Sequence, residues 1–182
     1  FGQFLNNHVY DLVFGYGWYT EGDSNVARGN RVHHNIFGFH NRTGWTNAVV
    51  ENNLIYSNYG SHWCCGSDAD RVHTGGAGYW TAAPATNTVF RNNVIFNHPP
   101  NTYGGLSLHP GSGARVYNNT IYNNKIGLSI NGSGVIARNN IIYGNTINVE
   151  LTGSGSDTVM SHNLCTGHAS CSVTGNPLVI SP

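Results

Sequence analysis

Three features of the sequence predict an all-β fold, a right-handed parallel β-helix solenoid of about six to eight coils with three short strands per coil. First, a short motif centred on asparagine recurs at a period near twenty residues. Second, apolar and polar residues alternate around each copy, as they do in β-strands. Third, Gly, Asn and Ser residues separate the short apolar segments.

The asparagine motif occurs six times, and a weaker copy stands at the start of the chain. The anchor residues are Asn35, Asn53, Asn93, Asn119, Asn140 and Asn163, with Asn7 in the weaker copy. Asparagine tolerates left-handed backbone geometry, and its amide both donates and accepts hydrogen bonds. We therefore expect the anchors to stack at a tight bend and to satisfy buried backbone groups there, as scaffold residues.

Aligning the copies on the anchor predicts which strand positions face inward. Three residues before it stand Phe4, Val32, Val50, Phe90, Val116, Ala137 and Met160. Two residues after it stand Val9, Phe37, Ile55, Ile95, Ile121, Ile142 and Cys165. Both columns are apolar throughout, whereas the column two before the anchor is mixed and is expected to face outward. A further strand per coil is expected at 127–130 and at 148–151, where the spacing is tight.

A single domain over residues 1–182 is expected. The chain starts at Phe1 almost directly in a repeat, so we also expect it to be a fragment of a longer chain. The anchor spacings are 28, 18, 40, 26, 21 and 23 residues. The interval of 40 is either two coils, one without an anchor, or one coil with a long insertion. The lack of apolar alternation at 61–80 favours an insertion, which predicts a loop excursion at about 58–87.

The composition excludes some partners. Only 9% of the residues are charged, with 8 Lys and Arg against 8 Asp and Glu. Nucleic acid binding requires clustered cations, so it is not expected. No segment approaches the roughly 20 apolar residues that span a bilayer, so no membrane span is expected.

The loop excursion is the best candidate site, because the excursions of a solenoid carry function more often than its regular coils do. It concentrates residues that can act in catalysis, namely Asp68, Asp70, Arg71 and His73, together with Trp63 and Trp80, which can bind substrate. In a lyase or epimerase, Asp68 and Asp70 could hold substrate or a hard cation such as Ca²⁺, with Arg71 or His73 as the base. No other cofactor is indicated.

Two other chemistries and a structural role stay open for this loop. A glycoside hydrolase needs two carboxylates about 5–9.5 Å apart, which Asp68 and Asp70 could supply, alone or with Glu21 or Asp23. A zinc site would use His62, Cys64, Cys65 and His73. These four lack any standard ligand spacing, so no metal site is predicted from them. The structural alternative is a turn with local hydrogen bonds, in which the tryptophans only fold the loop onto the solenoid.

Aromatic residues form a second candidate binding surface. Three residues after the anchor stand Tyr10, Gly38, Tyr56, Phe96, Tyr122 and Tyr143. Exposed rings stack on sugars, which makes Tyr56, Phe96 and Tyr122 candidates for substrate binding. The alternative is that the rings stabilise neighbouring coils by stacking on one another. His40, His98 and His168 share a column five after the anchor, where turn capping is expected.

The cysteines suggest an oxidising compartment. Cys165 and Cys171 are six residues apart around a turn, so we expect a local disulfide. Cys64 and Cys65 are adjacent, and they could form a strained bridge, pair elsewhere or stay free. A secreted, periplasmic or cell-surface location is therefore expected.

The repeats resemble those of the pectin-lyase-like superfamily of right-handed parallel β-helices, over essentially the whole chain. Gly175 to Pro182 is similar to the segment that follows the last coil in many secreted members. The resemblance implies a polysaccharide lyase, glycoside hydrolase or epimerase, although the superfamily also contains phage tail spikes and adhesins. The Asp-Pro-His-Asp motif of alginate epimerases and the paired aspartates of polygalacturonases are missing. Two functions follow as expectations: binding or cleavage of a polysaccharide, or a structural or adhesive role with other protein subunits as partners.

Overall fold

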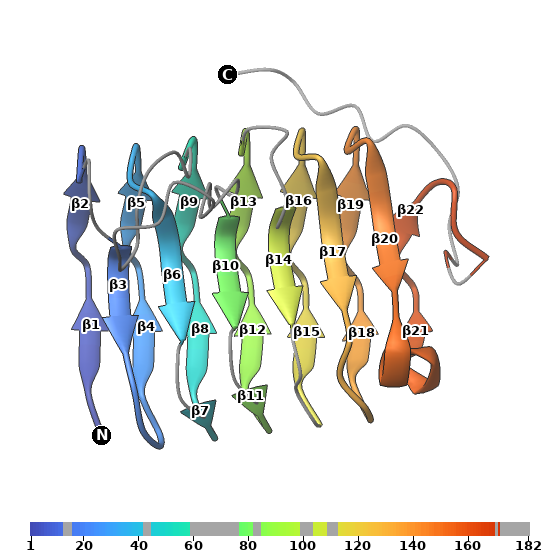
Figure 1. The fold of residues 1–182 in the computed structure, drawn as a ribbon, viewed down its shortest axis with the longest axis horizontal. Helices are drawn as coiled ribbons and strands as arrows, with labels where there is room; N and C mark the ends of the chain where they lie inside the picture. The colour runs from blue at the N-terminus through green and yellow to red at the C-terminus, as the bar shows by residue number, and fades with distance from the viewer. Residues whose placement is uncertain are drawn as a thin grey trace, which may run out of the picture.

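The structure, a computed structural model, describes residues 1–12, 16–41, 45–58, 77–81, 85–98, 104–108, 113–169 and 171. These residues form a parallel β-helix in which each coil contributes one strand to each of three sheets (Figure 1). Among them the structure has no α-helix, and one 3-10 helix, η1 (Gly153–Asp157), follows the last strand of sheet 3. The all-β prediction is confirmed.

Each sheet runs the length of the solenoid. Sheet 1 consists of β1 (Gln3–Leu5), β4 (Val26–Arg28), β8 (Val49–Glu51), β12 (Val89–Arg91), β15 (Arg115–Tyr117), β18 (Ile136–Arg138) and β21 (Val159–Ser161). Sheet 2 consists of β2 (His8–Tyr10), β5 (Arg31–His33), β9 (Leu54–Tyr56), β13 (Val94–Phe96), β16 (Thr120–Tyr122), β19 (Ile141–Tyr143) and β22 (Leu164–Cys165). Sheet 3 consists of β3 (Tyr16–Thr20), β6 (Phe37–Asn41), β10 (Ala77–Thr81), β14 (Gly104–Leu108), β17 (Ile126–Ile130) and β20 (Ile147–Leu151). The short strands β7 (Trp45–Thr46) and β11 (Ala85–Thr86) pair separately.

With seven strands in each of two sheets, the described residues confirm the prediction of six to eight coils and three strands per coil. The middle residues of the sheet 1 and sheet 2 strands face inward. In sheet 1 they are Phe4, Ala27, Val50, Phe90, Val116, Ala137 and Met160. In sheet 2 they are Val9, Val32, Ile55, Ile95, Ile121, Ile142 and Cys165. All of these residues except Val9 form one continuous apolar core together with Phe39, Leu106 and Leu128 of sheet 3.

The predicted register is wrong in one coil, the second. Its anchor is Asn30, whose side chain contacts Asn7 on one side and Asn53 on the other. Asn35 lies at the next corner, between sheets 2 and 3, and Phe37 begins β6 in sheet 3. The two corners share a local signal, because each places a residue of positive φ directly before a buried asparagine: Gly29 before Asn30, and His34 before Asn35.

The first asparagine ladder stabilises the corner between sheets 1 and 2. It consists of Asn7, Asn30, Asn53, Asn93, Asn119, Asn140 and Asn163. At a typical rung the Asn53 side-chain amide donates to Asn93 Oδ1 at 2.9 Å and to the Ala27 carbonyl at 3.1 Å. The Asn53 backbone N–H donates to the same Asn93 oxygen at 3.0 Å. Each side chain therefore satisfies backbone groups of neighbouring coils, as predicted.

A second ladder, which is not among our predictions from the sequence, stabilises the corner between sheets 2 and 3. Its members are Asn35, Asn58, His98, Asn124 and Asn145. His98 takes the place of an asparagine: its Nδ1 lies 2.9 Å from Asn124 Oδ1, and its Nε2 lies 3.2 Å from the Asn58 amide. Because an amide oxygen only accepts and an amide nitrogen only donates, the neutral His98 carries its proton on Nδ1. Burial lowers the pKa of His98 from 6.5 to about 4.

This second ladder revises the expected histidine column. His98 does have a turn position, but His40 lies in the middle of sheet 3, paired in register with Tyr19 and the backbone of Trp80. The expectation that these two share a column is wrong, because it depended on Asn35 as the anchor of the second coil. Numbered from Asn30, the residue five after the anchor is Asn35, and this residue belongs to the ladder.

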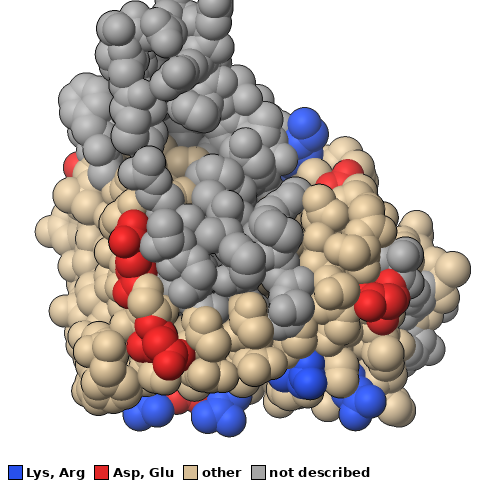
Figure 2. Space-filling model, turned by 60° about the horizontal axis from the view of Figure 1, so that its bottom comes forward, with Lys and Arg blue, Asp and Glu red and all other residues tan. Residues whose placement is uncertain are grey.

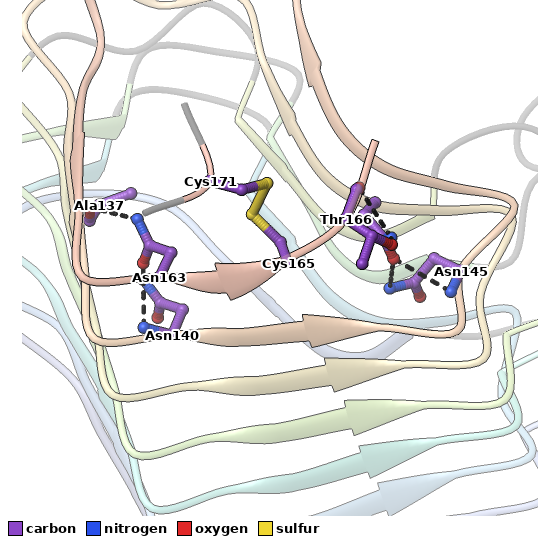
Figure 3. Close-up of a disulfide and its surroundings, with 8 residues drawn as sticks. Ala137, Asn140, Asn145, Asn163, Cys165, Thr166 and Cys171 are labelled. Atoms are coloured by element: carbon purple, nitrogen blue, oxygen red, sulfur yellow. Dashed lines mark hydrogen bonds between the residues drawn. A yellow bond between two sulfur atoms is a disulfide. The ribbon is translucent and has the colours of Figure 1, made fainter. Parts of the chain in front are cut away.

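A disulfide closes the C-terminal end of the core. Cys165 bonds to Cys171 with their Cα atoms 5.3 Å apart, the pairing expected from their spacing. Cys165 is fully buried against the coil beneath it, and Cys171 packs on the same core. Figure 3 shows the two sulfurs lying over the interior of the last coil, between Asn163 of the first ladder and Asn145 of the second.

Removing this disulfide is expected to destabilise the last coil. In the double variant Cys165→Ser/Cys171→Ser we expect the free energy of unfolding to fall by about 2 kcal/mol, the chain-entropy contribution of so short a loop. Urea unfolding under oxidising conditions measures the change. Ala169→Ser, an exposed change in the same turn, is the control and is expected to leave stability unaltered. Equal free energies of unfolding for the double variant and the control would mean that the disulfide does not stabilise the C-terminal end of the core.

Candidate functional site

The outward face of sheet 3 carries the most varied chemistry among the described residues. The register aligns one residue from each strand of the sheet: Tyr19, His40, Ser107, Ser129 and Glu150, with the backbone of Trp80 between His40 and Ser107. Their neighbours Phe39, Leu106 and Leu128 face the core, so the column faces outward by the alternation of a β-strand. Adjacent members lie about 4.8 Å apart along the axis. This column is called the sheet 3 column below.

An aromatic cluster occupies the N-terminal end of the sheet 3 column. The Tyr19 ring stacks on His40 with the ring centroids 5.4 Å apart, and Tyr16 stacks on His40 at 4.6 Å and on Phe37 at 5.4 Å. Phe37 and His40 are buried, whereas Tyr19 is 40% exposed. The Tyr19 hydroxyl donates a hydrogen bond to the Glu21 carboxylate at 3.4 Å. This end therefore combines an exposed ring with an exposed carboxylate.

Hydroxyl groups and a second carboxylate occupy the other end of the column. Ser107 and Ser129 are buried, and the Ser129 hydroxyl donates to the Glu150 carboxylate at 2.9 Å. Glu150 is half-buried. The column thus changes from aromatic to polar along the solenoid axis.

The interval of 40 residues is one coil with an insertion. Asn53 hydrogen-bonds directly to Asn93, and β9 pairs directly with β13, so no second coil intervenes. Residues 77–81 and 85–86, inside the predicted excursion of 58–87, form the regular strands β10 and β11.

The residues proposed for catalysis in this insertion, Asp68, Asp70, Arg71 and His73, lie outside the described residues, as does Trp63. Both borders of the segment are described. The chain leaves sheet 2 after β9 at the corner that Asn58 occupies, and it re-enters sheet 3 at Ala77. Trp80 belongs to β10, between His40 and Ser107 in register. Chain connectivity therefore anchors the insertion at the corner beside the sheet 3 column.

The predicted aromatic file lies on sheet 2, and its register differs in one member. It contains Tyr10, His33, Tyr56, Phe96, Tyr122 and Tyr143, with His33 where Gly38 was expected. Tyr56 stacks on Phe96 at 5.0 Å, and Phe96 stacks on Tyr122 at 4.8 Å. Because the ring faces cover one another, a ligand would reach mainly ring edges and hydroxyls. Burial also raises the pKa of the Tyr122 hydroxyl. The file therefore stabilises neighbouring coils.

Charged side chains form a ladder on the outward face of sheet 1. The Glu51 carboxylate, 4% exposed, accepts hydrogen bonds from Arg28 of the preceding coil and Arg91 of the next. Burial alone would raise the pKa of Glu51, but these hydrogen bonds and the two positive charges outweigh it and hold the pKa below its usual value. Figure 2 shows most of the visible Lys and Arg side chains along the lower edge of the molecule. The register places Arg138 further along the column of Arg28 and Arg91. The ladder links three coils and supplies no catalytic group.

A comparison with protein families shows to which family the chain belongs. The family described as right-handed beta helix region matches residues 69–177, which is more than half of the chain. The chain belongs to the right-handed β-helix family. Comparisons with curated proteins and with solved structures give no match. The handedness that the sequence predicted is therefore confirmed through the family.

Two further findings bear on ligands of this right-handed β-helix. No helix in the described part of the chain is long and apolar enough to cross a membrane. Within the same residues, no group of three or more His, Cys, Asp or Glu side chains could hold a metal ion. The chemistry that the described face of the β-helix offers is therefore ring stacking and hydrogen bonding through Tyr19, Glu21 and Glu150.

Proposed function

We propose that this right-handed β-helix is an extracytoplasmic protein that binds a polysaccharide across the outward face of sheet 3. The aromatic cluster carries the proposal. Tyr19 offers an exposed ring that is held in place by stacking on buried His40, and the Glu21 carboxylate lies within hydrogen-bonding reach of its hydroxyl. A sugar presents an apolar ring face and a rim of hydroxyls, which suit a fixed aromatic ring beside a carboxylate.

The shape of the face also supports a polymer as the ligand. The sheet 3 column repeats one residue per coil in a straight file, at about 4.8 Å per step. An extended glycan that follows this file would meet the exposed Tyr19 towards one end and the half-buried Glu150 at the other. The backbone of Trp80 follows His40 in this file, and Trp80 stays a candidate for substrate binding.

The proposal includes cleavage by the insertion beside this face. Asp68 and Asp70 are the candidate carboxylates, and Arg71 and His73 are the candidate bases, as in the lyase or hydrolase chemistry described above. The borders of the insertion at Asn58 and Ala77 support this proposal, because both lie at the corner next to the sheet 3 column. The disulfide at Cys165 and Cys171 supports an oxidising compartment outside the cytoplasm.

A binding assay with matched tyrosine variants tests the proposed face. Against a panel of neutral and uronic polysaccharides, Tyr19→Ala is expected to weaken binding about two- to tenfold, the contribution of one stacked ring. Tyr10→Ala is the control, because Tyr10 is 52% exposed but lies on sheet 2. A larger loss of polysaccharide affinity for Tyr10→Ala than for Tyr19→Ala would contradict the proposed face and would assign binding to the aromatic file on sheet 2.

Product formation on the same panel separates binding from cleavage. Reducing ends indicate a hydrolase, and unsaturated products indicate a lyase. We expect Asp68→Asn/Asp70→Asn to abolish either product while it preserves binding. Binding without turnover would contradict the cleavage part alone. A protein that neither binds nor cleaves any member of the panel would contradict the whole proposal and favour the structural alternative.

A further inference from the structure

Three histidines meet on the first two coils of sheet 2, away from the face proposed above. His8 of β2 and His33 of β5 lie on neighbouring strands, and their Nε2 atoms are 2.7 Å apart. His34 follows directly in the chain, and its Nδ1 lies 2.6 Å from Nδ1 of His33. His33 is therefore the centre of the group, with one ring nitrogen directed at each of the other two imidazoles.

The surroundings fix the His33 ring in this orientation. Tyr10 stacks on one side with the ring centroids 5.4 Å apart, and Tyr56 stacks on the other at 4.6 Å. His33 is 8% exposed, whereas His8 is exposed on the edge strand of the sheet. The pair therefore combines one rigid imidazole with one that can adjust.

One Nε2 atom donates a hydrogen bond to the other at this distance, and a metal ion can take the place of the shared proton when both rings present lone pairs. Zinc bound tetrahedrally by imidazoles at 2.0–2.1 Å holds the two nitrogens about 3.3 Å apart. The pair would have to open by only about half an ångström to reach this separation, and the exposed His8 can supply that movement. A metal-bound histidine usually donates its other ring N–H to a fixed acceptor. Here His33 can donate from Nδ1 to His34 Nδ1.

The nearest cationic side chain is held by the neighbouring coil. Arg31 directs its guanidinium to the Tyr56 hydroxyl in the coil beyond, where Nε donates at 2.8 Å, and it lies over the Tyr56 ring with Cζ 5.4 Å from the ring centroid. The charged groups that act on His33 have both signs, since Asp11 is negative and Arg31 is positive.

We propose that His8 and His33 bind a divalent transition-metal ion, with Zn²⁺ as the reference ion, through their Nε2 atoms. His34 acts as the outer hydrogen-bond partner that fixes the His33 tautomer. Since the described residues hold no group of three metal ligands, the protein supplies two donors here and water completes the coordination. The site selects against Ca²⁺, which prefers oxygen donors.

Calorimetric titration of untagged protein with Zn²⁺ alone tests the proposal. We expect one bound ion, and we expect His8→Ala and His33→Gln each to weaken binding by at least about tenfold. His34→Ala is expected to weaken it about tenfold or more through the lost outer partner. His162→Ala, an exposed histidine in the first-ladder corner, is the matched control and is expected to bind as the unchanged protein does.

Two further measurements make the result decisive. Circular dichroism of each variant shows whether the coils are intact, and the imidazole ¹⁵N shifts of the unchanged protein report which nitrogens bind zinc. Shifts at Nε2 of His8 and His33 would support the site. Zinc affinity that is equal in the unchanged protein and in both ligand variants would overturn it, as would the absence of binding at millimolar zinc. Calcium that competes with zinc would overturn the assignment to nitrogen donors.

Discussion

Replacing Asn119 by alanine is expected to lower the free energy of unfolding by about 4 kcal/mol, the largest effect that we expect from any single side chain in this protein. Asn119 is 1% exposed in the middle of the first ladder. Its Oδ1 accepts from the backbone N–H and from the side-chain amide of Asn93, both at 3.0 Å. Its own amide donates to the Phe90 carbonyl and to Asn140 Oδ1, also at 3.0 Å.

The size of the effect follows from the groups that lose their partners. Without the side chain, the Asn93 N–H and the Phe90 carbonyl are left buried beside an apolar methyl group. Each unsatisfied buried group costs about 1–3 kcal/mol, and the hydrogen bonds to the neighbouring asparagines are lost in addition. Water cannot easily replace them, because Val116 and Ile121 on either side of the corner are fully buried.

Urea unfolding of three variants measures this prediction. Asn119→Ala should show the full loss. Asn119→Asp keeps the shape and the acceptor but removes the donors and buries a charge, so we expect at least as large a loss. Asn118→Gly is the control: Asn118 is exposed and has a φ of 54°, which glycine adopts without strain. A loss for Asn119→Ala within about 0.5 kcal/mol of that control would contradict the role of the ladder.

The regular part of this fold could be predicted because each coil repeats the same physical problem. A buried corner needs an amide at the same place in every coil, and an interior position needs an apolar side chain. The corner position is therefore asparagine in each of these coils, and the residues align in the sequence as one column: Asn53, Asn93, Asn119 and Asn140. The inward columns follow from the same register, whereas the disulfide follows from the spacing of Cys165 and Cys171.

The second coil was placed wrongly because two corners of the β-helix use the same local solution. Asn30 and Asn35 are both buried and both follow a residue of positive φ. Only the pairing of strands tells them apart, and pairing is a long-range property. A signal for the second ladder was present: Asn58, Asn124 and Asn145 stand five residues after their anchors, as does Asn35 when Asn30 is the anchor.

The candidate site could be predicted only in part. The insertion was recognised, because it interrupts a regular period, and the direct bond between Asn53 and Asn93 supports that inference. The sheet 3 column was missed. The strands of sheet 3 begin at different numbers of residues after the corner between sheets 2 and 3. Tyr19, His40 and Ser107 therefore do not align in the sequence. The aromatic file was found, but a stack of rings covers its own faces, and this property appears only in three dimensions.

Acid is expected to destabilise this β-helix between pH 6.5 and 4 by about 3 kcal/mol through a single residue, His98. In the folded protein its pKa is about 4, because the ring is buried in the second ladder, whereas its usual value is 6.5. The unfolded chain therefore binds a proton in this window that the folded protein does not bind. The contribution of His98 to the free energy of unfolding is fully present above pH 6.5. It decreases as the pH falls towards 4 and changes no further below pH 4.

Two other groups change stability in the same direction. The pKa of His33 is lowered by burial and by His34, so its contribution is also lost as the pH falls below 6.5. The pKa of Glu51 is lowered by Arg91 and Arg28 against the effect of its burial, so its contribution is lost only at pH values below its usual 4.5. A variant of His98 should therefore reduce the slope of stability against pH without removing it.

His98→Asn isolates the contribution of this histidine. Asparagine is the residue that the ladder uses in the neighbouring coils, so it can bond to Asn58 and Asn124 without a group that titrates. Relative to the unchanged protein, its stability is expected to rise by about 2.5 kcal/mol between pH 7.5 and pH 4.5, as measured by urea unfolding at the two pH values. His162→Asn, the same substitution at an exposed corner, is the control. Parallel profiles of stability against pH for His98→Asn and the unchanged protein would contradict this prediction, because they would mean that His98 is protonated inside the fold. A charged imidazole cannot accept a hydrogen bond, so the bond from the Asn58 amide to His98 Nε2 would then be absent.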